Sequence, residues 1–203
     1  MKLPAGYTIS WSGQFEYLER AKQHLMTVVP LTLVIIVLLL YLNFRRFGDV
    51  AIILLTLPLS LTGGVLLLWI LGYHLSVAVA VGFIALAGVA TEIGVIMMTY
   101  LNHAWERRQR AAAEQGRKPE LEVLREAVLE GAALRVRPIV MTVTAILAGL
   151  LPIMLGGGTG SEVMRRIAAP MVGGMLSVTV LALLVVPCVY YLRYRGSLGA
   201  FRR

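Results

Sequence analysis

The sequence predicts an all-α integral membrane protein with five transmembrane helices and one cytoplasmic amphipathic helix. Hydrophobic residues make up 58% of the 203 residues and charged residues only 15%, whereas soluble domains carry about 25% charged residues. The uncharged stretches are long enough to cross a bilayer, which takes about 20 apolar residues. The net charge of +8 comes from basic residues placed between those stretches, a pattern that indicates membrane topology and not a nucleic-acid-binding surface.

The first 25 residues are expected to be the end of an external region. Met1 to His24 lacks the apolar core of a signal peptide. The segment from Ile9 to Gly13 is typical of a short strand that leads into a polar helix. A single strand has no stable partner, so the chain resembles one that begins inside a larger external domain.

The five helices follow from uncharged runs of sequence. Leu25–Phe44 holds the first, and Val50–Thr91 is long enough for two helices, with a break at the polar and glycine-containing segment 71–76. Pro138–Ser161 and Ile167–Leu192 hold the last two. The predicted helices are therefore 26–44, 50–71, 76–101, 138–155 and 166–192.

The segment 102–137 between the third and fourth spans is predicted to contain a surface helix. Apolar residues recur there at spacings of three and four, while charged residues occupy the other faces. The apolar positions are Leu121, Leu124, Val128 and Ala132. We expect this amphipathic helix to lie along the membrane surface and to end at Pro138, which starts the fourth span.

The distribution of lysine and arginine predicts the orientation. Fourteen of the nineteen basic residues fall on one side, in the first short loop, in segment 102–137 and in the tail 193–203. Basic loops stay in the cytoplasm. The N-terminus is therefore expected outside and the C-terminus inside.

Glu92 is the one acidic residue within the predicted spans. An ionised carboxylate at the centre of a membrane helix costs about 2.5 kcal/mol or more. A carboxyl group that takes up and releases protons is what a proton-coupled transporter needs, because a desolvated acid exists readily in its neutral form. The alternative is a permanently neutral side chain that hydrogen-bonds a neighbouring helix.

Few other residues carry chemistry. Thr142 and Thr144 could hydrogen-bond a group that carries a proton, although threonine also bonds to its own helix. Met164, at the outer end of the last span, offers a thioether that suits soft ions such as Cu(I), or it is an apolar filler. With one cysteine and no catalytic or zinc motif, we expect neither an enzyme nor a permanently bound cofactor.

Four segments in order resemble the resistance–nodulation–division permeases, and within them the heavy-metal efflux branch, closest to the copper and silver exporters. These segments are Ile9–Tyr17, Gly82–Glu92, Leu134–Pro138 and Gly160–Gly174. The resemblance covers nearly the whole chain. Permeases of this family are several times longer, so the chain is similar to their last five membrane helices, in the second half of the protein.

The resemblance implies a proton/metal antiporter of the bacterial inner membrane, with a periplasmic N-terminus and the metal ion as cargo. In the family the permease is a homotrimer that docks to a periplasmic adaptor and an outer-membrane channel. Glu92 matches the glutamate of the family's proton relay, and Met164 matches a methionine of the copper and silver path. Ile139 departs from the pattern, because the copper and silver exporters have a lysine there.

Three interpretations stay open. The chain is the membrane portion of such an exporter, or a truncated polypeptide that transports nothing and has a structural or regulatory role in permease trimers. Alternatively, it is a small independent five-helix transporter. The exported metal and the oligomeric state are not determined by these residues.

Overall fold

The computed structural model describes residues 14–114, 116 and 121–200, all of which lie in helices or the short connections between them. The expected strand at Ile9–Gly13 lies outside the described residues. The chain divides into two units, residues 1–45 and 46–203. The first unit contains α1 (Gln14–Phe44), whose segment Gln23–Phe44 is long and apolar enough to cross a membrane.

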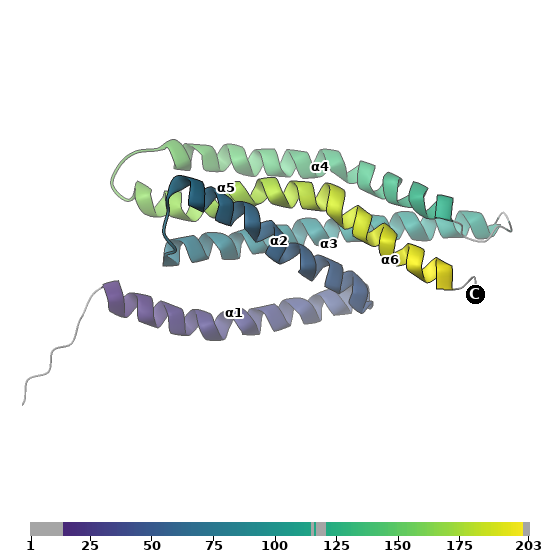
Figure 1. Ribbon diagram of the computed structural model, residues 1–203, viewed down its shortest axis with the longest axis horizontal. Helices are drawn as coiled ribbons and strands as arrows, with labels where there is room; N and C mark the ends of the chain where they lie inside the picture. The colour runs from purple at the N-terminus through teal and green to yellow at the C-terminus, as the bar shows by residue number, and fades with distance from the viewer. Residues whose placement is uncertain (1–13, 115, 117–120, 201–203) are drawn as a thin grey trace, which may run out of the picture. The chain divides into compact units, whose positions relative to one another are not determined.

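The second unit contains the remaining helices (Figure 1). They are α2 (Phe47–Leu71), α3 (Val77–Glu114), α4 (Leu121–Leu155), α5 (Ser161–Val180), a π-helical turn η1 (Leu181–Val185) and α6 (Val186–Ala200). Helix α5 contacts α2, α3 and α4 and therefore forms the centre of this unit. Counting α5, η1 and α6 as one span, the described residues hold five helices long and apolar enough to cross a membrane, as the sequence predicts.

The separate surface helix expected before Pro138 is not observed. Residues 121–137 instead form the first part of α4, which continues through Pro138. Proline removes one backbone hydrogen bond, and in membrane helices neighbouring groups compensate for that loss. Helix α3 also extends beyond the predicted end at residue 101, and ion pairs join the two extensions, from Arg108 to Glu126 (2.6 Å) and to Glu130 (2.9 Å).

The sequence predicts the last span at 166–192. In the structure the corresponding helical segment runs from Ser161 to Ala200 and is interrupted by η1. Pro187 stands two residues after the end of this turn. A proline ring collides with the carbonyl group four residues earlier in an α-helix. The carbonyl group four residues before Pro187 belongs to Leu183, which lies inside η1. Pro138 and Pro170 lie in α-helices without a π-helical turn, so a proline alone does not predict one.

Close backbone contact joins α2 to α5. A Cβ atom on Gly173 would overlap the carbonyl oxygen of Gly63, and a Cβ atom on Gly63 would overlap that of Gly173. Small residues allow membrane helices to approach in this way. The pair fixes the separation of the two helices at the centre of the unit.

Candidate functional site

Glu92 lies within the apolar part of α3, on an uncovered face of the helix. Ala90 and Gly94 border a small gap against Thr56 of α2, and in a helix these two positions are about 160° away from Glu92. Glu92 is accordingly exposed in the second unit, whereas Ala90 and Gly94 are buried. The carboxylate therefore points away from α2.

No hydrogen bond or ion pair joins Glu92 to any other described residue. Thr142 and Thr144 are both exposed on α4, while Val143 between them is buried. Neither threonine makes a hydrogen bond to Glu92 within the described part of the chain. Their supporting role stays a prediction.

Ile139 and Met164 occupy contrasting environments. Ile139 is buried on α4, with 4% of its surface exposed. Met164 is exposed in the first turn of α5. It borders an open hollow of about 410 Å³ beside the glycine-rich connection 156–160. The described residues contain no group of three or more His, Cys, Asp or Glu side chains that could hold a metal ion.

A polar cluster joins α2, α3 and α6 at the end of the unit that is rich in arginine, here called the basic end. Asp49, in the first turn of α2, is fully buried and forms an ion pair with Arg193 of α6. Asn102 of α3 donates a hydrogen bond from Nδ2 to Oδ2 of Asp49 (3.1 Å). Asn102 Oδ1 accepts one from the hydroxyl group of Tyr190 (2.9 Å). The carboxylate of Asp49 and the hydroxyl group of Tyr190 are both buried, and both therefore have hydrogen-bonding partners, as buried polar groups require.

The cluster extends through aromatic contacts. Tyr190 stacks on Tyr194 with ring centroids 4.5 Å apart. Arg46 donates a hydrogen bond to the hydroxyl oxygen of Tyr194 (2.7 Å). This phenol raises the pKa of the Arg46 guanidinium, which therefore keeps its positive charge. Gly48 leaves room for Arg193, because a Cβ atom there would overlap the guanidinium group.

Asp49 could not be recognised as a buried charge from the sequence, because it stands just before the predicted start of the second span. The structure begins α2 at Phe47 and so places Asp49 inside the helix. Its partner Arg193 is 144 positions away in the sequence. A local signal did exist, since acidic residues favour the first turn of a helix, but nothing local indicated burial.

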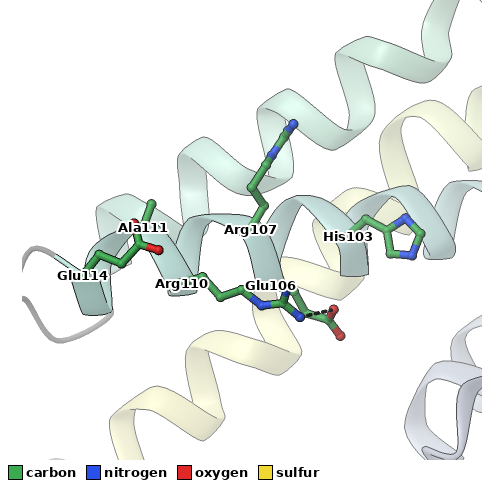
Figure 2. Close-up of a pocket in the computed structure, with 6 residues that line it drawn as sticks. All are labelled: His103, Glu106, Arg107, Arg110, Ala111 and Glu114. Atoms are coloured by element: carbon green, nitrogen blue, oxygen red, sulfur yellow. Dashed lines mark ion pairs between the residues drawn. The ribbon is translucent and has the colours of Figure 1, made fainter.

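The extension of α3 carries an open hollow of about 580 Å³ (Figure 2). The side chains that line it come from one helix and lie at spacings of three and four. They are His103, Glu106, Arg107, Arg110, Ala111 and Glu114. Arg110 and Glu106 form an ion pair (3.9 Å), whereas Arg107 pairs with Glu130 of α4.

The comparisons with known proteins identify the family. The profile of the AcrB/AcrD/AcrF family matches residues 1–193. The chain belongs to this family. Its members are transporters, which agrees with the five apolar helices.

Within the AcrB/AcrD/AcrF family, the relatives of this chain include metal-efflux proteins. The chain is 51% identical over 197 residues to the cation efflux system protein CusA of Escherichia coli (strain K12), covering 96% of this chain and 18% of CusA. It is 40% identical over 195 residues to the cobalt-zinc-cadmium resistance protein CzcA of Cupriavidus metallidurans, covering 96% of this chain and 17% of CzcA.

A solved structure supports the same assignment to this family. The crystal structure of a heavy metal efflux pump superimposes with a TM-score of 0.74 at 36% identity. The superposition covers 94% of this chain and 18% of the pump. The chain thus spans about a fifth of the length of the relatives it matches, and it is a multi-pass membrane protein of the heavy-metal efflux branch.

Proposed function

We propose that this chain is the last membrane portion of a proton-driven heavy-metal efflux permease, in which Glu92 carries the proton. The carboxylate of Glu92 lies in an apolar helix and has no partner among the described residues. Retaining an ionisable group there costs about 2.5 kcal/mol or more in a bilayer. A role in proton transport, in which Glu92 alternates between its neutral and its charged form, would explain why the chain retains this costly residue.

The uncovered face around Glu92 favours a second helical layer in the complete permease. Gly88, one turn from Glu92, is exposed, and a Cβ atom there would meet nothing within 4 Å. A helix from the rest of the permease could therefore approach closely and supply an acidic or basic partner. We extend the proposal to a homotrimer in the inner membrane that docks to a periplasmic adaptor and an outer-membrane channel.

We propose Cu(I) or Ag(I) as the cargo. The higher identity to CusA than to CzcA supports this choice, and so does the exposed thioether of Met164, since thioethers select soft ions. Ile139 replaces the lysine of the copper and silver exporters, so the relay in this chain would lack that cation. A carboxylate from outside the chain would then be the relay partner of Glu92.

We propose that the basic end lies in the cytoplasm. The extensions of α3 and α4, with Arg107, Arg108 and Arg110 among their residues, would form a cytoplasmic helical hairpin in place of the separate surface helix expected from the sequence. The N-terminus would lie in the periplasm. The tail after residue 192 would lie in the cytoplasm.

The test uses the full gene product that contains this sequence, reconstituted in vesicles with a trapped pH-sensitive dye. Silver ion, and then zinc and cobalt ions, are added, and proton movement is recorded. We expect silver-dependent proton movement that Glu92→Gln abolishes. The control is Glu122→Gln, which removes an exposed carboxylate from the first turn of α4.

Each result decides part of the proposal. Silver-dependent proton movement that Glu92→Gln leaves intact would overturn the role of Glu92. Movement with zinc or cobalt alone would overturn the choice of metal. Absence of movement with every metal would overturn proton-driven transport by this protein.

A further inference from the structure

A polar stripe runs along α3 from Glu92 to the basic end. With 100° between successive residues of a helix, five further polar or charged side chains fall within about 40° of Glu92. They are Thr99, His103, Glu106, Arg110 and Glu114. All except the half-buried Thr99 are exposed in the second unit, so this is the uncovered face of the helix.

A carboxyl group in the apolar part of a membrane helix needs a route by which protons reach water. At a rise of about 1.5 Å per residue, Thr99 lies about 10 Å along the axis from Glu92, and His103 lies about 6 Å beyond Thr99. The Thr99 hydroxyl group donates to the carbonyl oxygen of Val95 (2.8 Å). Its oxygen can still accept a hydrogen bond from a water molecule, which suits an intermediate position on such a route.

His103 stands where this stripe meets the open hollow. The hollow of about 580 Å³ gives water access to the imidazole, and Figure 2 shows the ring at one end of the row of lining side chains. No hydrogen bond or ion pair involves His103 within the described part of the chain. Glu106 and Arg110, by contrast, pair with each other.

Several charged groups of the neighbouring helices at this end are occupied in other contacts, whereas Glu122, Arg125 and Arg137 of α4 and Arg195 of α6 are exposed. On α4, Glu126 and Glu130 pair with Arg108 and Arg107, and the Arg135 guanidinium lies over the Tyr100 ring, 4.4 Å from its centroid. On α2 and α6, Asp49 and Arg193 belong to the cluster that contacts α3 through Asn102. The imidazole of His103 lines the hollow and has no partner among the described residues, so it is placed to accept and release a proton.

We propose that His103 is the proton-transfer group that connects Glu92 to water at the basic end of α3. The proposal rests on the proposed function of Glu92. The Glu92 carboxyl group loses a proton to a chain of water molecules that the Thr99 oxygen holds by accepting a hydrogen bond, and this chain passes a proton to the lone pair of the imidazole. Glu92 is left as a carboxylate, and the imidazolium then releases a proton to water in the hollow. Histidine suits this step because its charge ordinarily changes between pH 5 and 8.

The experiment compares three variants of the full gene product in the vesicle assay described above. His103→Ala removes the imidazole, and His103→Gln keeps a polar side chain that does not titrate. His74→Gln is the matched control, because His74 is an exposed histidine in the connection between α2 and α3, at the other end of α3. We expect both His103 variants to slow silver-dependent proton movement at least about tenfold, since a positioned proton-transfer group contributes about 10²–10⁴-fold.

Chemical rescue separates proton transfer from a structural role. Imidazole added on the side of the basic end can enter the space that His103→Ala leaves in the hollow. It should restore proton movement to that variant, with a dependence on pH that follows the free-base fraction of the added imidazole. A purely structural role for His103 would give no rescue.

The outcomes also separate this proposal from the one on which it rests. If Glu92→Gln abolishes proton movement while His103→Ala and His103→Gln behave as the unmodified protein, the role of His103 is overturned and that of Glu92 stands. Slow proton movement in His103→Ala that added imidazole does not restore also overturns the proposed role of His103. If Glu92→Gln itself has no effect, the proposed function fails first, and this inference fails with it.

Discussion

The buried carboxylate of Asp49, at the start of α2, forms an ion pair with the guanidinium of Arg193 in α6. The pair joins two helices that are far apart in the sequence. Asn102 adds the third helix, α3, through its hydrogen bond to the same carboxylate. Because α3 also carries Glu92, this cluster fixes the helix on which the proposed proton carrier stands.

Removing one partner of this pair should destabilise the protein. Arg193→Gln leaves a buried carboxylate without its cation, a change that costs about 3–5 kcal/mol in other proteins. The Arg193 side chain is 35% exposed, so we expect a value near the lower end of that range, measured as a lower melting temperature in detergent.

The matched control for this prediction is Glu106→Gln, which removes the exposed pair with Arg110. That pair has a separation of 3.9 Å, and exposed pairs contribute about 0–1 kcal/mol. A melting temperature for Arg193→Gln equal to that of the control would show that the buried pair contributes no stability.

Substitution of Gly173 by alanine should disturb the contact between α2 and α5. The new methyl group would overlap the carbonyl oxygen of Gly63, and such overpacking costs about 1–3 kcal/mol. Gly149→Ala is the control, because a Cβ atom at Gly149 meets nothing within 4 Å. We expect only Gly173→Ala to lower the melting temperature, and equal values would contradict the close approach of the two backbones.

Much of the fold could be predicted because the signals for it are local. A long uncharged run indicates a membrane helix wherever it occurs, and the predicted helix ends at residues 44, 71 and 155 are confirmed by Phe44, Leu71 and Leu155. The continuity of α4 through Pro138 could not be predicted from its own sequence. The part of α4 before Pro138 forms ion pairs with α3, such as Arg108–Glu126. These pairs join segments that are apart in the chain, so the sequence of α4 alone does not indicate them.

The same distinction applies to the candidate site. Glu92 could be identified because a carboxylate inside an apolar run is unusual by itself. The stripe from Glu92 to His103 follows from the length of α3, which the sequence did not reveal because the polar residues after 101 indicated a loop. The cluster around Asp49 depends on Arg193, and only the folded chain brings these residues together.

Replacement of Ile139 by lysine should destabilise the protein unless an acidic partner is present. Ile139 is buried with 4% of its surface exposed, and a buried cation without a partner is costly. We expect Ile139→Lys to lower the melting temperature and Ile139→Leu to change it little. An unchanged melting temperature for Ile139→Lys would indicate that a carboxylate reaches this position, as in a relay of the copper and silver type.

The last prediction concerns Met164 and the proposed path of a soft metal ion. Met164→Leu keeps the apolar volume but removes the thioether sulfur, so it tests metal binding separately from packing. We expect cells that depend on this protein to lose silver resistance with Met164→Leu. Met141→Leu makes the same change at an exposed methionine of α4 and should leave the minimum inhibitory concentration of silver unchanged. Equal resistance in the two variants would exclude a role for the Met164 sulfur in transport, because both proteins retain the same number of methionines.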